Sequence, residues 1–268
     1  MIKTLVIGVA GRMGKTIVSC LEDTDGIELS GGTEASGSAN IGKDIGDLAG
    51  IGRKNIIVDS DLDKLVASCD AIIDFTTPDS TMNTLEFATK HNKALVIGTT
   101  GLNAEQKNAI KEKCSIIRCV FAPNMSIGVN VLFKTVKDLA KTMGDAYDVE
   151  IVEAHHKFKK DAPSGTAVRL SEIAAEALGR NLETDGVYGR QGMSDGRGPK
   201  EIGIHTVRAG DIVGEHRVMF GGMGETLEIS HRAQSRDTFA RGSIAAAKWV
   251  VDQPPGLYDM QDVLGLTN

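Results

Sequence analysis

The chain opens with Thr4-Leu-Val-Ile-Gly8-Val-Ala-Gly11-Arg-Met-Gly14, an apolar run that leads into three evenly spaced glycines and then a helical pattern. A strand, a glycine turn and a helix start in this order can seat a phosphate on the helix N-terminus. The spacing is G-x-x-G-x-x-G rather than the usual G-x-G-x-x-G, so the loop alone does not decide its ligand. We predict a dinucleotide site and keep open a glycine-rich turn that binds another nucleotide or none.

An acidic residue follows the next apolar run, at the place where a dinucleotide site needs one. Glu34 lies 20 residues after Gly14, and its carboxylate can accept hydrogen bonds from the adenosine ribose hydroxyls. Residue 35 is alanine, so no arginine follows Glu34 to meet a 2′-phosphate, which the carboxylate would repel. These positions favour NADH as the cofactor. Arg12 could still swing to a 2′-phosphate, so NADPH stays open.

Short apolar runs alternate with helical patterns over the first half of the chain. The predicted strands cover residues 3–8, 27–33, 56–58, 71–75, 94–98 and 116–121. Helix starts lie between them, at Pro78 with Asp79 and at the capping-box pair Asn103 and Gln106. This alternation is typical of an α/β fold, and we expect a Rossmann-like, doubly wound parallel sheet.

The pattern changes after a predicted helix over residues 128–143. One convincing helix then lies among longer extended runs, at residues 149–154, 201–208, 212–220 and 226–232. A helical pattern returns at residues 236–251. We therefore expect an inserted α+β domain built on a mixed or antiparallel sheet.

These patterns divide the chain into two expected domains. The dinucleotide-binding domain covers residues 1–126 and is completed by residues 237–268, and the inserted domain covers residues 127–236. The two crossings between them lie where a two-domain enzyme would hinge, with the ligand in the cleft between domains. A glycine-rich stretch, residues 188–199, is expected to be a long surface loop.

Composition excludes several classes of protein. The net charge of −6 and the absence of a broad basic stripe argue against nucleic acid as a partner. No apolar run approaches the roughly 18 residues of a membrane span, and the first residues do not resemble an export signal, so we expect a cytoplasmic protein. The four cysteines form no C-x-x-C pair, and we expect reduced core thiols and no metal.

Two further loops follow predicted strands, at residues 98–101 and 122–128. Ligands of doubly wound sheets bind at the carboxyl ends of strands, and the small residues of these loops would let a flat ring approach the backbone. Both segments are equally compatible with ordinary strand-to-helix turns.

A basic segment stands out against the acidic chain, because residues 155–160 contain two histidines and three lysines. The segment follows a predicted strand and leads through Pro163 and Ser164 into an amphipathic helix. The start of that helix, at Gly165 and Thr166, offers unpaired backbone N–H groups and the positive end of the helix dipole. We expect a small polyanion to bind here.

The histidines could instead belong to a metal site with Asp161. Adjacent residues of a strand point to opposite faces, however, and nearby lysines oppose a second cation, so this alternative is disfavoured. Lys157 and Lys160 are expected to be solvated, and Asp161 to shape the turn or pair with a lysine. A protein that only senses a dinucleotide remains a second alternative, because the nucleotide fold says nothing about chemistry.

Taken together, the glycine loop, the Gly-Thr-Thr-Gly loop at residues 98–101, and the segment at residues 124–130 resemble the dihydrodipicolinate reductase family. The most specific element is His155-His-x-x-Lys159-x-Asp161-Ala-Pro-Ser-Gly-Thr166. Further similar strings are Val207 to His216 and Gly256 to Leu264, so the resemblance spans essentially the whole chain.

The resemblance implies a cytoplasmic homotetramer, joined through the second domain. It implies reduction of 4-hydroxy-tetrahydrodipicolinate, via dihydrodipicolinate, to tetrahydrodipicolinate with release of water, in diaminopimelate and lysine biosynthesis. His155 and Lys159 then take catalytic roles, and His156, Gly165 and Thr166 hold the cyclic dicarboxylate substrate. The residues implied to bind NADH or NADPH are Gly8, Val9, Ala10, Gly11, Arg12, Met13, Glu34, Gly98, Thr99, Thr100, Ala122, Pro123, Asn124 and Met125.

Overall fold

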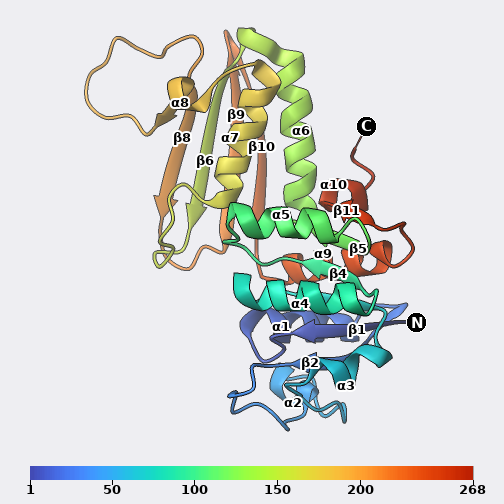
Figure 1. Ribbon diagram of the computed structural model, residues 1–268. Helices are drawn as coiled ribbons and strands as arrows, with labels where there is room; N and C mark the ends of the chain where they lie inside the picture. The colour runs from blue at the N-terminus through green and yellow to red at the C-terminus, as the bar shows by residue number, and fades with distance from the viewer. Residues whose placement is uncertain (268) are drawn as a thin grey trace. The chain divides into compact units, whose positions relative to one another are not determined.

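In the computed structural model, which describes residues 1–267, the first unit joins residues 1–127 to the end of the chain from Arg236 and is built on a six-stranded sheet (Figure 1). Its order is β11-β5-β4-β3-β1-β2, and all five pairings are parallel. The strands are β1 (Ile2–Ile7), β2 (Ile27–Thr33), β3 (Ala71–Asp74), β4 (Ala94–Ile97), β5 (Arg118–Phe121) and β11 (Gly256–Tyr258). The predicted doubly wound parallel sheet is confirmed.

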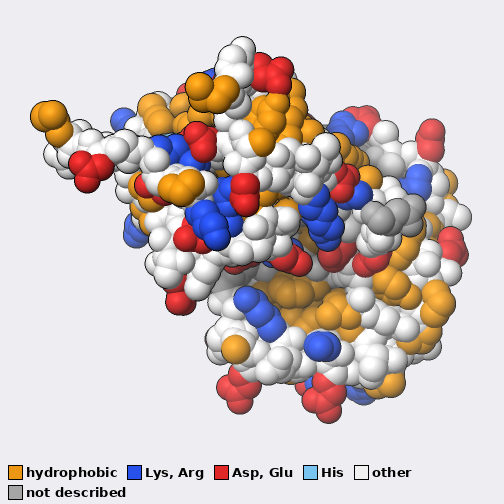
Figure 2. All heavy atoms as spheres, turned by 90° about the horizontal axis from the view of Figure 1, so that it is seen from above, with side chains coloured by type: hydrophobic (Ala, Val, Ile, Leu, Met, Phe, Trp, Pro, Cys, Tyr) orange, Lys and Arg blue, Asp and Glu red, His pale blue; other side chains and the backbone are white. Residues whose placement is uncertain are grey.

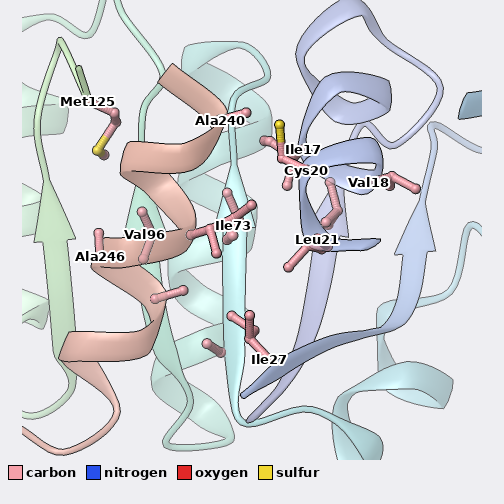
Figure 3. Close-up of a cluster of buried hydrophobic side chains, with 14 of the residues drawn as sticks. Ile17, Val18, Cys20, Leu21, Ile27, Ile73, Val96, Met125, Ala240 and Ala246 are labelled. Carbon is pink, nitrogen blue, oxygen red and sulfur yellow. The ribbon is translucent and has the colours of Figure 1, made fainter. Parts of the chain in front are cut away.

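Helices cover both faces of this sheet. The central strands β3 and β4 are mainly apolar, and this packing buries them on both sides. On one face, α1 and α9 pack together, with side chains such as Ile17 and Ala240 meeting Ile73 of the sheet (Figure 3). On the other face, α4 and α5 bury a second cluster that includes Leu85 and Ile110. The helices of this unit are α1 (Arg12–Glu22), α2 (Ile45–Ala49), α3 (Leu62–Leu65), η1 (Val66–Ser68), α4 (Pro78–Lys90), α5 (Ala104–Lys113), α9 (Asp237–Val250) and α10 (Met260–Val263).

The prediction of a sheet strand at residues 56–58 is wrong. Ile57 and Asp59 make only isolated bridges, to Asp44 and Thr33. The backbone of this segment is hydrogen-bonded mainly to residues 42–45, which form a turn and helix start and cannot extend the ladder. The prediction also missed β11 and β7 (Gly186–Tyr188), whose three residues are too short to show a periodic pattern.

The second unit, Gly128–Ser235, is built on a five-stranded mixed sheet of order β10-β9-β6-β8-β7. β6 is parallel to β8 and antiparallel to β9, so the expectation of a mixed sheet is confirmed. The remaining elements are α6 (Ile127–Met143), η2 (Gly144–Ala146), β6 (Asp148–His155), α7 (Gly165–Leu178), α8 (Leu182–Asp185), β8 (Ile202–Arg208), β9 (Gly214–Gly222) and β10 (Glu225–Ala233).

The register of β6 places the important side chains of this unit. Val149 and Ile151 enter a core shared with α6 and α7, and the alternation along the strand continues that buried face to Glu153 and His155. Two polar residues therefore lie at the end of an otherwise apolar face. Among residues 1–267, none of the helices is long and apolar enough to cross a membrane.

The glycine-rich stretch is a projecting loop, seen at the left edge of Figures 1 and 2. Met193 lies fully exposed within it. Its two ends are held to the sheet, because Arg190 and Arg197 both donate hydrogen bonds to Glu150 of β6. The loop thus lacks regular structure, as predicted, but is anchored by charge.

Candidate active site

The glycine loop forms the junction between β1 and α1, and its geometry requires small residues. Gly8 has φ +66°, and Gly11 donates a backbone hydrogen bond of 2.9 Å to the Gly8 carbonyl. A Cβ on Gly14 would lie 2.3 Å from that carbonyl oxygen. No side chain caps the start of α1, and its first turn contains no acidic residue. The junction therefore fits a phosphate held by the first N–H groups of α1.

Glu34 lies beside this junction, directly after β2. Its Oε1 accepts a 2.8 Å hydrogen bond from the backbone N–H of Ala10, which joins the acid to the glycine loop. Ala35 and Arg12 are both exposed. A half-buried carboxylate with a second oxygen to spare fits the hydroxyl pair of a ribose.

The loop after β4 is held in place by hydrogen bonds among threonine hydroxyls and a buried aspartate. Thr99 is buried, and its Oγ1 accepts hydrogen bonds from the Thr76 N–H at 3.0 Å and the Thr81 hydroxyl at 2.8 Å. It lies 3.3 Å from Oδ1 of the buried Asp74, at the end of β3. A Cβ on Gly98 would collide with the ring of Phe75, so this loop also needs glycine.

The predicted cofactor residues differ in what they can offer to a ligand. Gly11, Arg12, Thr100 and Pro123 are exposed, whereas the side chains of Val9, Thr99, Ala122 and Met125 are buried in the unit. The buried members can contribute backbone groups but not side chains. In the loop after β5, the Asn124 side chain accepts a 2.9 Å hydrogen bond from the Ser126 N–H and shapes the turn.

In the second unit, β6 ends in a pair of buried polar residues, Glu153 and His155. Oε2 of Glu153 lies 2.6 Å from Nδ1 of His155, because residues two apart on a strand share one face. Arg208, at the end of the neighbouring β8, makes a bidentate pair with both carboxylate oxygens at 2.8 Å. The Ser164 N–H donates to Oε1 at 2.9 Å.

This arrangement keeps Glu153 ionised. Burial alone would raise the pKa of Glu153, but hydrogen bonds from Arg208, His155 and the Ser164 N–H lower it to about 2. Burial lowers the pKa of His155, and the nearby Lys159 and Arg208 lower it further, against the opposing effect of Glu153. His155 is therefore neutral at pH 7, with its proton facing the carboxylate.

A second buried histidine, His216 of β9, lies edge-on to His155 with ring centroids 5.2 Å apart. Its Nε2 is 3.1 Å from the Ser164 hydroxyl. Burial lowers the pKa of His216 to about 3, so it is also neutral. Gly214 leaves room for His155, because a Cβ there would lie 3.1 Å from His155 Nε2.

The turn after β6 presents Lys159. Its Nζ pairs with Oδ2 of Asp161 at 2.9 Å, which confirms the expected pairing of that acid with a lysine. The Lys159 hydrogen bond lowers the pKa of Asp161. Lys157 and Lys160 are exposed, as predicted. Since His155 and Asp161 each have charged partners, they are poorly placed to share a metal.

The turn ends at α7, whose N-cap is Ser164. The Ser164 hydroxyl accepts a hydrogen bond from the Ala167 N–H at 3.2 Å. Gly165 is exposed, and nothing lies within 4 Å of a Cβ built on it. Thr166 is half-buried beside it. The start of this 14-residue helix is accessible to an anion and has no acidic residue in its first turn.

The structure brings the predicted catalytic and substrate-binding residues together in the second unit, while the predicted cofactor residues lie in the first. Sequence reasoning missed the network around His155, in which Glu153 and His216 contact the ring and Arg208 and Ser164 bind Glu153. One local signal was present, because an acid two residues before His155 must share its strand face. Arg208 and His216 had no such signal, since they meet Glu153 and His155 only through strand pairing.

Comparison with protein families shows to which family this chain belongs. The model for the N-terminus of dihydrodipicolinate reductase matches residues 2–125, and the model for its C-terminus matches residues 128–264. The chain belongs to the dihydrodipicolinate reductase family. It is an oxidoreductase, and in this family the N-terminal domain binds NAD(P)H.

Individual relatives agree with this assignment. The 4-hydroxy-tetrahydrodipicolinate reductase of Syntrophus aciditrophicus is 53% identical over 99% of both chains. The protein of the same name from Trichlorobacter lovleyi is 54% identical over 99% of this chain and 100% of its own. A solved dihydrodipicolinate reductase from Paenisporosarcina sp. TG-14, with dipicolinate bound, superimposes with a TM-score of 0.77 at 24% identity, covering 98% of each chain.

Proposed function

We propose that this chain uses NAD(P)H to reduce 4-hydroxy-tetrahydrodipicolinate, via dihydrodipicolinate, to tetrahydrodipicolinate with release of water. This is the activity that its relatives' name describes, and it serves diaminopimelate and lysine biosynthesis. One observation carries the proposal. The buried His155, the lysine paired with Asp161 and the exposed start of α7 are linked through Glu153 and Arg208 by hydrogen bonds at one end of one sheet.

The substrate is a cyclic dicarboxylate, and the residues offer two places for its carboxylates. The first N–H groups of α7, at Gly165 and Thr166, suit one of them. His156 follows β6, and its Nδ1 is buried without a partner among residues 1–267, so a reoriented ring could serve the other. Lys157 and Lys160 would add a positive field that attracts the dianion.

The proton chemistry falls to Lys159 and His155. NAD(P)H would supply the hydride when bound, and the negative charge left on the ring nitrogen would have to be neutralised by a proton from a side chain. Lys159 Nζ is the proposed principal donor, since its contact with the Asp161 carboxylate at 2.9 Å holds it in place. His155 Nε2 is the proposed acid/base for loss of the 4-hydroxyl as water.

The proposed cofactor residues are those of the glycine loop, Glu34, and the loops at residues 98–100 and 122–125. We expect NADH to be preferred, because Glu34 lies beside the glycine loop and Ala35 brings no positive charge. Arg12 is exposed and free to turn toward a 2′-phosphate, so NADPH should bind more weakly rather than not at all.

We also propose a cytoplasmic homotetramer that forms through the second unit. Within that unit α6 and α7 pack on one face of the sheet. The opposite face presents side chains such as Ala154 and Val207, which are register partners on β6 and β8, and no helix of residues 128–235 covers it. An uncovered sheet face with apolar side chains suits pairing with a second copy.

The central test is NADH consumption with 4-hydroxy-tetrahydrodipicolinate formed in situ from pyruvate and aspartate semialdehyde. The purified full chain should oxidise NADH only when the intermediate is present, as followed by absorbance. A protein that only senses dinucleotides would bind NADH, seen as a change in its fluorescence, without consuming it. Binding without turnover would therefore contradict the proposed reaction while leaving the dinucleotide site intact.

A further inference from the structure

We infer that Glu153 and Arg208 form a positioning pair that holds His155, Lys159 and the start of α7 in register. The inference rests on the proposed function, since it assigns the pair to the proton-transferring residues of that reaction. Neither residue need touch the substrate. Each acts through the residues to which it is hydrogen-bonded.

Glu153 lies in the interior of the second unit. Its side chain is completely buried, and a buried carboxylate is costly unless every oxygen is paired. Glu153 meets this condition with His155 and Arg208 on one oxygen, and with Arg208 and the Ser164 N–H on the other. An apolar pair of similar volume would often be as stable at such a site. A charged pair therefore points to a role other than stability.

The first role is to set the tautomer of His155. Nδ1 faces an ionised carboxylate at 2.6 Å and must carry the proton of the neutral ring. Nε2 has no hydrogen-bond partner among residues 1–267 and stays available for acid/base work. An acid that orients a catalytic imidazole through Nδ1 is a recurrent device of enzymes.

The second role reaches Lys159. Arg208 Nη2 donates a 2.6 Å hydrogen bond to the backbone carbonyl of Asp161, and the Asp161 carboxylate pairs with Lys159 Nζ. The guanidinium thus fixes the turn that presents the lysine. The hydrogen bond from the Ser164 N–H to Glu153 ties the N-cap of α7 to the same carboxylate. One buried pair therefore orients all three parts of the site.

The test uses Glu153→Gln in the full chain, because glutamine keeps the shape and removes the charge. We expect kcat to fall about 10- to 100-fold, the usual effect of removing a residue that hydrogen-bonds and orients a metal-binding histidine. The KM for NADH should stay within about twofold, since the cofactor residues lie in the other unit. Circular dichroism and thermal unfolding establish that the variant is folded.

The pH profile separates positioning from a structural role. Four groups face His155: Glu153 from its own strand, Arg208 from β8, His216 from β9, and Lys159 from the turn. Of these only Glu153 raises the pKa of His155, so its loss should move the histidine limb of kcat to lower pH. A structural defect would reduce the fraction of active enzyme but would leave the pH at which the histidine limb of kcat falls unchanged.

Glu150→Gln is the matched control. Glu150 lies on the same strand, is bonded to Arg190, Arg197 and His205, and has a pKa lowered to about 2 by those partners despite its burial. It is unconnected with His155, so this variant should keep the wild-type pH profile. Arg208→Lys should reduce kcat as Glu153→Gln does, since one ammonium cannot replace the fork of contacts.

Nitrogen-15 NMR of the histidine rings tests the pair even if the proposed reaction fails. Wild-type His155, assigned by comparison with His155→Gln, should show a protonated Nδ1, and Glu153→Gln should show a mixture of tautomers. Unchanged ring signals in Glu153→Gln would overturn the inference. So would a wild-type kcat and pH profile in that variant. Absence of NADH consumption by the wild type would count only against the proposed function.

Discussion

At the scale of single residues, Lys159 and Lys157 lie in the same turn but are expected to have different roles. Lys159 is held by Asp161, whereas Lys157, two residues earlier, is exposed. We expect Lys159→Ala to lower kcat by about 10²- to 10⁴-fold, the usual value of a positioned proton donor. Lys157→Ala should change kcat less than tenfold and mainly raise the KM of the dianion. Equal turnover in Lys159→Ala and the wild type, measured by NADH absorbance, would remove Lys159 from the mechanism.

The proposed preference for NADH depends on two residues, Glu34 and Ala35. Ala35→Arg places a cation beside Glu34, where a 2′-phosphate would lie. We expect the ratio of kcat/KM for NADPH to that for NADH to rise about tenfold, corresponding to roughly 1.4 kcal/mol. Parallel titrations with the two cofactors measure this ratio. If the wild type already uses both equally, Arg12 compensates, and Arg12→Ala should restore a preference for NADH.

At the scale of elements, the β1–α1 junction depends on Gly14. A Cβ at this position would lie 2.3 Å from the Gly8 carbonyl oxygen and 2.7 Å from Val9 Cα. Gly14→Ala should therefore displace α1 and destabilise the fold by about 1 to 3 kcal/mol, as overpacking does. NADH affinity should fall as well, measured by fluorescence titration. Gly37→Ala is the control, since nothing lies within 4 Å of a Cβ there.

The second sheet carries a pH dependence through His216. Burial lowers its pKa from 6.5 to about 3, so the folded state binds fewer protons than the unfolded chain between these values. Stability from this group is complete above pH 6.5 and is lost as the pH falls toward 3. Urea unfolding at pH 7.5 and 5.0 should show the loss. The loss should be smaller in His216→Gln, and the part that remains should come from His155 and His231, whose pKa values burial also lowers.

At the scale of the whole molecule, the proposed homotetramer would form through the face of the second sheet that no helix of residues 128–235 covers. Val207→Lys places a charge on that face, beside Ala154 of the next strand. We expect the tetramer to dissociate to smaller species, measured by light scattering after gel filtration. Ile116→Lys is the control, because Ile116 is an exposed apolar residue of the first unit. A tetramer that survives Val207→Lys would exclude this face as the interface.

Much of the architecture followed from local patterns in the chain. Apolar runs of four or more residues predicted most strands, and start signals such as Pro78 and the Asn103–Gln106 capping box predicted helices correctly. Three-residue strands such as β7 and β11 escaped because they carry too little pattern. Residues 56–58 were wrongly predicted as a strand because a short β-branched run does not show what it pairs with. Here it pairs with the turn at residues 42–45 and does not join the sheet.

Most of the helices and strands, the glycine junction and the motif from His155 to Thr166 could be predicted from the chain alone, because each depends on neighbours along the chain. The partners of that motif come from distant parts of the chain and are fixed by strand pairing. Glu153 meets Arg208, 55 residues away, because β6 and β8 lie side by side, and His216 approaches through β9. Such contacts depend on strand order and register, which arise from the packing of the whole sheet and leave no local pattern.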